Sequence, residues 1–157
     1  MRKKTVLKLI EKKPGISYNK IVHETCLSNG VISHYLIKLL ESGEIEKEGL
    51  VRGKYFLKGV PKKDRILITL LRNKTNNDIF RLLINDSSKI NKNFSANEIA
   101  KSVKKSGPTV SVSLKILLKN NIIERIIMNK NSKLTSDIAY VISNKKMWTT
   151  YLVKYNL

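Results

Sequence analysis

The sequence predicts a mainly helical protein with small β-hairpins (α+β), built as two copies of one unit. Three observations predict this fold class. Two stretches of the chain align with each other without a gap, the apolar positions of each copy first follow a helical spacing, and that spacing then shortens to two residues, as in a strand. A chain of 157 residues can hold two small domains, and its 41% of hydrophobic residues is enough for packed cores.

The internal repeat relates residues 16–46 to residues 94–124 at a constant offset of 78, and ten of the 31 aligned positions are identical. The identical pairs are Ser17/Ser95, Asn19/Asn97, Ile21/Ile99, Ser28/Ser106, Ser33/Ser111, Leu36/Leu114, Leu39/Leu117, Leu40/Leu118, Ile45/Ile123 and Glu46/Glu124. Chance similarity between two Lys- and Ile-rich segments does not keep serines and leucines in register. We therefore predict a first domain at 1–60, a linker with a connecting helix at 61–74, and a second domain with a C-terminal helix at 75–157.

Each copy shows three helix signals in the same order. The first helix has apolar residues at helical spacing, and a serine, Ser17 or Ser95, then precedes a short second helix. Ser95 with Glu98 forms the S-x-x-E pattern of a capping box. A third helix follows Ser28 or Ser106, and its buried stripe has i, i+4, i+7 spacing. The stripe residues are Ile32, Leu36 and Leu39 in the first copy and Val110, Leu114 and Leu117 in the second.

The pattern after each third helix predicts a β-hairpin. Gly43 ends the third helix of the first copy, and strands follow near Ile45 and at Lys54–Leu57. Asn120 and Asn121 end it in the second copy, where strands follow at 122–128 and 138–142. A last helix is expected over 145–155.

Three helices, with a tight turn between the second and third, and a hairpin make a winged helix-turn-helix. The segments LSNGVISHYLIKLLESGEIE and SGPTVSVSLKILLKNNIIE, each with its downstream hairpin, resemble the archaeal-type tandem winged-helix transcriptional regulators. The resemblance covers nearly the whole chain. It implies two winged helix-turn-helix domains in tandem joined by a connecting helix, DNA binding, and control of transcription.

The charge of the chain points to a polyanionic partner. There are 31 Lys and Arg against 12 Asp and Glu, a net charge of +19, and such an excess attracts nucleic acid through its phosphates. Part of it follows from the Lys-, Ile- and Asn-rich composition that an AT-rich gene gives to any protein. Residues 1–60 have 12 basic and 6 acidic residues (+6), and residues 61–157 have 19 and 6 (+13).

The third helix of a winged helix enters the major groove, where its N-terminal half meets base edges. In the first copy this helix is free of acidic residues before Glu41, and its outer side is small or hydrogen-bonding. The DNA-binding candidates there are Ser28, Asn29, Gly30, Ser33, His34 and Lys38. Asn, Ser and His can bond to base edges, Gly30 permits close approach, and Ser28 at a helix N-terminus can hold a phosphate oxygen. The alternative is that Ser28, Asn29 and Gly30 merely start a helix.

The second copy keeps the core stripe but lacks long polar side chains for reading bases, since Val112 stands where the first copy has His34. Its DNA-binding candidates are Lys104, Lys105, Ser106, Thr109, Ser111 and Lys115. Lysines contact phosphates, which position a protein without conveying sequence. We expect this copy to grip phosphates or to have exchanged DNA reading for protein contact. The hairpins add Arg52, Lys54, Lys130 and Lys133 as candidates, with a solvated loop charge as the alternative.

Other functional classes find little support in the sequence. No glycine-rich phosphate loop, nucleophile motif or carboxylate pair is present, and two His with one Cys are too few for a closed zinc site. We expect no enzyme, no cofactor and no metal, and Cys26 should be a small buried residue. Because no apolar run could span a membrane, and one cysteine suits a reducing compartment, we expect a cytoplasmic, nucleoid-associated protein without an obvious small-molecule ligand.

The C-terminal segment offers a candidate homodimer surface. Trp148, Tyr151, Leu152 and Tyr155 share one helical face, with ordinary core packing as the alternative. The main hypothesis is a double-stranded DNA-binding transcriptional regulator that reads bases with the third helix of the first copy and grips phosphates with the second copy and the hairpins. Two alternatives stay open: an architectural, chromatin-type protein that coats DNA, and a protein-interaction module of a transcription or replication assembly.

Overall fold

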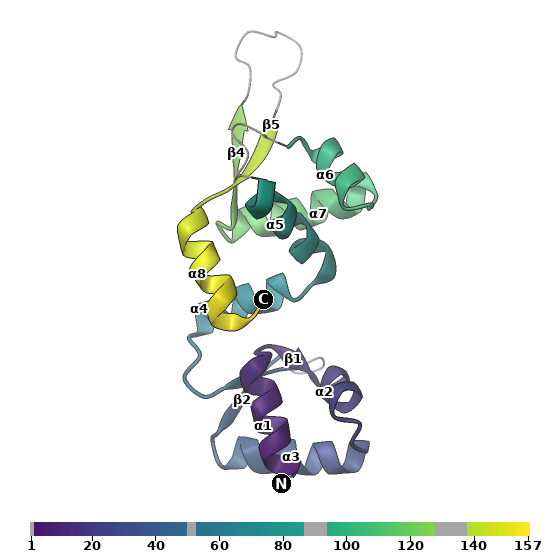
Figure 1. The fold of residues 1–157 in the computed structure, drawn as a ribbon, viewed down its shortest axis with the longest axis vertical. Coiled ribbons are helices and arrows are strands. Elements are labelled where there is room, and N and C mark those ends of the chain that lie inside the picture. Colours follow the sequence, from purple (N-terminus) through teal and green to yellow (C-terminus); the bar gives the residue numbers. More distant parts are fainter. Residues whose placement is uncertain (1, 50–52, 87–93, 128–137) are drawn as a thin grey trace. The chain divides into compact units, whose positions relative to one another are not determined.

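The fold class expected from the sequence is confirmed: the chain is mainly helical, with two small antiparallel sheets, and holds two winged helix-turn-helix domains in tandem (Figure 1). The structure, a computed structural model, describes residues 2–49, 53–86, 94–127 and 138–157. Two compact units are present. Unit 1 comprises Met1–Thr69 with Leu152–Leu157, and unit 2 comprises Leu70–Tyr151. The division drawn from the sequence, with a first domain at 1–60, a linker at 61–74 and a second domain at 75–157, remains a prediction.

Unit 1 has the helix–strand–helix–helix–hairpin order of a winged helix. Its elements are α1 (Arg2–Lys12), β1 (Ile16–Ser17), α2 (Tyr18–Thr25), α3 (Asn29–Glu41), β2 (Ile45–Glu48) and β3 (Lys54–Leu57), followed by most of α4 (Lys62–Leu71). The sheet order is β1-β3-β2, with Ile16 opposite Tyr55 and Ile45 opposite Leu57. Strand β1 was not expected, because it is two residues long and its second residue already begins the turn into α2.

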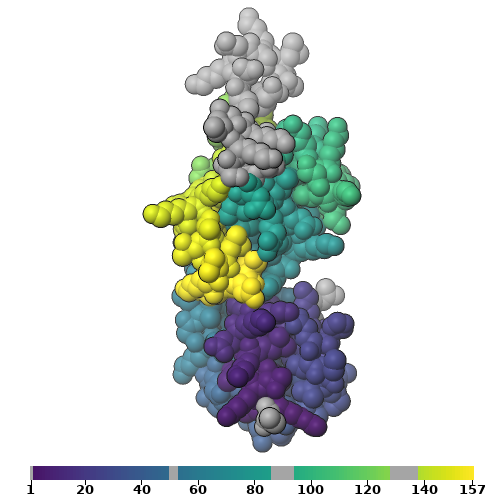
Figure 2. Space-filling view, in the orientation of Figure 1, coloured from purple at the N-terminus to yellow at the C-terminus, as the bar shows by residue number. Residues whose placement is uncertain are grey.

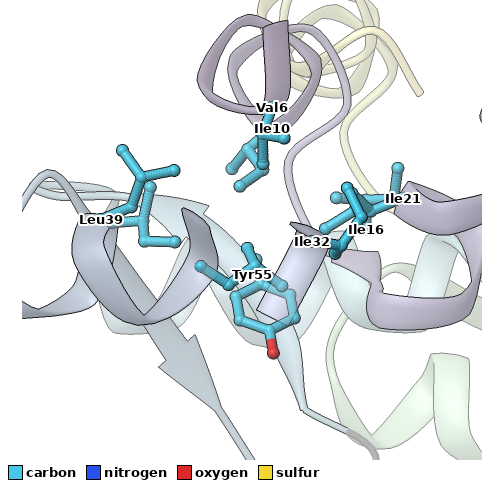
Figure 3. Close-up of a cluster of buried hydrophobic side chains, with 9 residues drawn as sticks. Val6, Ile10, Ile16, Ile21, Ile32, Leu39 and Tyr55 are labelled. Carbon is cyan, nitrogen blue, oxygen red and sulfur yellow. The ribbon is translucent and has the colours of Figure 1, made fainter. Parts of the chain in front are cut away.

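The core of unit 1 brings together the apolar stripes of its three helices (Figure 3). Val6 and Ile10 come from α1, Ile21 from α2, Ile32 and Leu39 from α3, Ile16 from β1 and Tyr55 from β3. All are buried, and burying each Leu or Ile side chain contributes about 1.5–3 kcal/mol. The i, i+4, i+7 pattern of α3 therefore turns its opposite side to solvent.

Helix α4 packs on unit 1 through a glycine. Gly15 has a left-handed φ of +74°, and a Cβ at this position would lie 2.9 Å from Cγ2 of Ile68. A side chain here would meet both backbone strain and a steric contact. Arg65 of α4 also forms an ion pair with Glu46 of β2, and its guanidinium lies over the Phe56 ring. The predicted connecting helix is thus partly a structural member of unit 1.

Unit 2 repeats the same order of elements. They are α5 (Lys74–Asp86), α6 (Ala96–Ser102), α7 (Gly107–Lys119), β4 (Ile123–Ile127) and β5 (Ile138–Ile142), followed by most of α8 (Lys145–Tyr155). Strands β4 and β5 form an antiparallel hairpin with Ile123 opposite Ile142. Phe94 forms a single bridge with Tyr140, just as Ile16 pairs with Tyr55 in unit 1. The bridge therefore takes the place of β1 in the second copy.

The backbone confirms the repeat at the turns. Cys26 and Lys104, which are 78 residues apart, both follow the second helix of their copy and have left-handed φ angles of 54° and 53°. Gly43 and Asn121, also 78 apart, follow the third helix with φ of 66° and 54°. The expectation that Cys26 is buried was wrong. As the left-handed residue that ends α2, it lies exposed, with its thiol 3.7 Å from the His23 carbonyl oxygen.

The apolar stripe of α8 packs within the chain. In unit 2, Trp148 is 1% exposed and its ring meets Phe80 edge to face at 5.7 Å. In unit 1, Tyr155 is buried and donates a hydrogen bond to the Asp64 carboxylate. Tyr151 and Leu152 are half-buried. The alternative of core packing thus describes Trp148 and Tyr155, whereas Met147 and Val153 of α8 are exposed. The C-terminal segment that contains α8 is yellow in Figure 2 and lies at the surface. None of the helices in the described part of the chain is long and apolar enough to cross a membrane.

Candidate nucleic-acid interface

The outer face of α3 carries the residues expected to contact DNA. Ser28, Asn29, Gly30, His34 and Lys38 are all exposed. A Cβ added at Gly30 would find no described neighbour within 4 Å, and the φ of Gly30 is not left-handed. The fold of unit 1 therefore does not require glycine at this position. A residue that leaves the backbone bare without a structural reason suits the close approach of a partner.

Ser33 differs from its neighbours because it has a partner inside unit 1. The hydroxyl of Tyr18, at the start of α2, donates to the backbone oxygen of Asn29 at 2.9 Å and lies 3.0 Å from Oγ of Ser33. Sequence reasoning missed Tyr18, since the second copy has Ala96 at the aligned position. These contacts hold the start of α2 against the first turns of α3. Ser33 therefore has a structural role in addition to lying on the outer part of α3.

The two copies treat their helix N-termini differently. Ser17 and Ser28 occupy the N-cap positions of α2 and α3 with extended backbone, but within the described chain neither side chain makes a cap hydrogen bond. In unit 2, Ser95 and Glu98 form a complete capping box, and Ser106 accepts a hydrogen bond from the Thr109 amide. Free N–H groups at a helix start attract anions. The serine side chains of unit 1 thus leave the N–H groups at the starts of α2 and α3 without a cap acceptor, whereas those of unit 2 each accept one backbone N–H.

A hollow of about 570 Å³ lies between the start of α2 and the hairpin of unit 1. It is lined by Ser17, Tyr18 and Asn19 on one side and by Lys47, Gly53, Lys54 and Tyr55 on the other. Of these, sequence reasoning selected Lys54 and missed the rest. The signal that was available is a basic hairpin in the same copy as a serine at a helix start, but the register of the hairpin was needed to place Lys47 and Tyr55 beside it.

The acidic side chains of unit 1 are largely engaged with basic ones. The ion pairs are Glu24–Lys13, Glu44–Lys3, Glu46–Arg65, Glu48–Arg65 and Asp64–Lys154. A hydrogen bond from Lys3 is the main cause that lowers the pKa of the Glu44 carboxyl. Such exposed pairs contribute little to stability. Their consequence here is that the carboxylates of unit 1 are partly neutralised, while α3 has no acid before Glu41.

The corresponding face of unit 2 is exposed and basic. Lys104, Lys105, Ser106, Thr109, Ser111 and Lys115 are all exposed. Ser106 and Thr109 are occupied with each other, their hydroxyl oxygens 2.8 Å apart. Val112 is 58% exposed, so the position aligned with His34 offers an apolar surface. The hairpin candidates Arg52, Lys130 and Lys133 lie outside the described residues.

The arrangement of both units defines the chain as a tandem winged-helix protein whose third helices turn polar and basic faces outward. In the described part of the chain, no group of three His, Cys, Asp or Glu side chains is placed to hold a metal ion. The exposed faces of α3 and α7 carry hydrogen-bonding groups and positive charges, which can bind a polyanion.

Comparison with known proteins shows similarity at the level of fold. No family model matches the chain, and no curated protein matches its sequence. MepR of S. aureus, in a complex with DNA, is 17% identical over 82% of this chain and 78% of MepR, with a TM-score of 0.43. ScpB from Mycobacterium tuberculosis is 9% identical over 95% of this chain and 91% of ScpB, with a TM-score of 0.38.

Proposed function

We propose that the chain binds double-stranded DNA and regulates transcription, as the resemblance to archaeal-type tandem winged-helix regulators implies. The observation that carries the proposal is the outer face of α3, which is exposed, free of acid before Glu41, and bare at Gly30. An α-helix of this kind fits the major groove, where amide and imidazole groups bond to base edges.

Within this proposal Asn29 and His34 read bases and Lys38 contacts the backbone. Ser33 has a smaller share in reading, because its hydroxyl is engaged with Tyr18. Lys104, Lys105 and Lys115 of unit 2 supply phosphate contacts. The open N-termini of α2 and α3 support a further point: unit 1 holds phosphates of its own, so the grip on the backbone is shared between the copies rather than left to unit 2 and the hairpins.

Selection of bound sequences from a random duplex pool tests the proposal. A regulator enriches a defined site, and excess random duplex then fails to displace the protein from it. A chromatin-type coating protein gives no enriched site, and random duplex displaces it. Absence of any duplex binding at low salt would leave the protein-interaction alternative and contradict DNA binding. Fluorescence anisotropy with a labelled duplex measures each case.

Gly30→Ala separates folding from DNA binding in one substitution. Because the added Cβ meets no described neighbour and Ala favours helix, the free energy of unfolding should stay equal or rise by up to about 1 kcal/mol. The same methyl group stands between the α3 backbone and DNA, and we expect duplex affinity to fall roughly tenfold. Urea denaturation and anisotropy give the two quantities.

Gly107→Ala is the matched control, since Gly107 opens α7 and its added Cβ also meets no described neighbour. It should change stability in a similar way and duplex affinity less. Equal affinity of Gly30→Ala and the wild type for the selected site would contradict the placement of α3 in the groove.

A further inference from the structure

The hollow beside the hairpin of unit 1 differs from an ordinary surface depression because it is lined by groups that bind anions. The start of α2 lies on one side, where Ser17 is the N-cap and its side chain makes no cap hydrogen bond within the described chain. The lysines of the hairpin, Lys47 and Lys54, lie on the other side. No acidic residue is among the described residues that line it.

Tyr55 supplies an independent sign of a ligand. Its side chain is 7% exposed, and its ring packs in the core while its hydroxyl oxygen points away from the other labelled side chains (Figure 3). Among the described residues this hydroxyl has no hydrogen-bond partner. Every fully shielded side-chain nitrogen or oxygen in that part of the chain does have one, so the hydroxyl keeps some accessible surface, and Tyr55 is among the residues that line the hollow. A hydroxyl that is almost enclosed and bonds to no described residue can donate its hydrogen to whatever occupies the hollow.

The hydroxyl of Tyr55 is a hydrogen-bond donor at neutral pH. Burial is the main cause that raises the pKa of Tyr55, and the nearby Tyr18 raises it further. A protonated phenol offers its hydrogen to an anion, as do the first free N–H groups of α2. The donors therefore face one space from two sides.

Gly53 leaves room for the side chain of one of the lysines. A Cβ added at Gly53 would lie 2.1 Å from Cε of Lys47 and 2.8 Å from its Cγ, so the Lys47 side chain runs across the glycine. The φ of Gly53 is not left-handed, so backbone conformation does not explain the glycine. The space that the Lys47 side chain occupies does explain it. Lys47 also pairs with Tyr55 across the strands. The Lys47 side chain therefore lies on the same face of the hairpin as Tyr55.

We propose that this hollow binds a phosphate group, held by the start of α2, the Tyr55 hydroxyl and the ammonium group of Lys47. The phosphate belongs either to the DNA backbone or to a small phosphorylated molecule, for which about 570 Å³ is ample space. The first source rests on the proposed function, and the second does not. Sequence reasoning foresaw no small-molecule ligand.

Tyr55→Phe tests the site, because it removes one oxygen and no hydrogen bond of the described structure. The probes are inorganic phosphate and thymidine 5′-monophosphate, with thymidine as the phosphate-free comparison, followed by NMR shifts of the full chain. Both phosphates should bind the wild type, thymidine should not, and Tyr55→Phe should weaken binding roughly tenfold, as for a lost hydrogen bond to a charged group. Tyr140→Phe, at the matching hairpin position of unit 2, is the control and should bind like the wild type. No phosphate binding together with unchanged duplex affinity in Tyr55→Phe overturns the proposal.

Gly53→Ala distinguishes a built site from general positive charge. It displaces the stem of Lys47 while every charge of the chain is kept, so phosphate affinity should fall although long-range attraction does not change. Affinity equal to that of the wild type in both Gly53→Ala and Tyr55→Phe would leave only diffuse attraction and would overturn the site.

The two sources of phosphate separate in a competition with labelled duplex. If the DNA backbone occupies the hollow, thymidine 5′-monophosphate displaces the duplex and Tyr55→Phe weakens duplex binding. If a small molecule is the natural occupant, Tyr55→Phe loses the nucleotide and keeps duplex affinity. Either result supports the phosphate site. A chain that binds nucleotide but no duplex contradicts the proposed function and leaves the site standing.

Discussion

At the scale of single residues, hydroxyl groups decide which parts of α3 are available to a partner. The exposure of Asn29, His34 and Lys38 could be predicted from the leucine stripe, because the stripe fixes which side of the helix faces solvent. The engagement of Ser33 could not. Its partner Tyr18 lies 15 residues away and meets it only because α2 crosses the first turns of α3. The roles of Tyr55 and Lys47 could not be predicted either, because their positions depend on strand register.

Tyr18→Phe tests the role of that hydroxyl. The variant loses the bonds to the Asn29 carbonyl and to Ser33, and the free energy of unfolding should fall by about 1–2 kcal/mol. Urea denaturation followed by circular dichroism measures it. Tyr35→Phe is the control, because the Tyr35 hydroxyl makes no hydrogen bond within the described residues. Similar losses in both variants would show that the bonds of Tyr18 contribute nothing of their own.

At the scale of elements, the helices occur in the predicted order and begin near the predicted residues, because caps and apolar spacing are local signals. The capping box of Ser95 and Glu98 was predicted and is confirmed. The N-cap positions of Ser17 and Ser28 are also right, but their cap bonds are missing. The residues three positions after these serines are Lys20 and Val31, whose side chains have no oxygen that could bond back to the cap residue. In unit 2 the side chains of Glu98 and Thr109 do form such bonds. Strand β1 lay beyond prediction, since two residues carry no periodicity.

This difference predicts unequal costs for removing the serine caps. Ser95→Ala breaks a bonded capping box and should lower the free energy of unfolding by about 1 kcal/mol. Ser17→Ala, at the aligned position, removes a hydroxyl that makes no cap bond and should cost a few tenths of that amount, roughly 0.3 kcal/mol. Thermal or urea unfolding of the two variants gives the comparison. A larger loss in Ser17→Ala would mean that the hydroxyl caps α2 in solution.

At the scale of the whole molecule, the sequence predicted two copies of one fold but not the composition of the compact units. The C-terminal residues 152–157 belong to unit 1, where Tyr155 meets Asp64 across 91 residues of sequence. A contact of such sequence separation has no local signature. The net charge of +19 also acts at this scale, because it draws a polyanion to the chain before any side chain has docked.

If the chain binds duplex DNA as proposed, the salt dependence of binding will show which lysines contact phosphates. Replacing Lys104, Lys105 and Lys115 together by Gln should weaken binding to all sequences. It should also reduce the slope of log K against log salt concentration by about 0.9 for each phosphate that a lysine no longer neutralises. Anisotropy titrations across a range of salt concentrations measure the slope.

Lys4, Lys8 and Lys12 provide the control with the same change of charge. They lie exposed on α1, which packs against the buried side of α3, and their replacement by Gln should leave the slope nearly unchanged. Equal slopes in the two triple variants would mean that the lysines of unit 2 act through net charge and not by touching phosphates.

The shared backbone of the two copies has a consequence for engineering. Because left-handed residues recur at Cys26 and Lys104 and at Gly43 and Asn121, α3 and α7 begin and end in the same way on interchangeable frames. We expect that the outward residues of one helix can be transplanted onto the other, because they lie opposite the buried stripe of each helix. If α3 reads bases as proposed, a chain with the α3 surface in both positions would carry two copies of the same reading face.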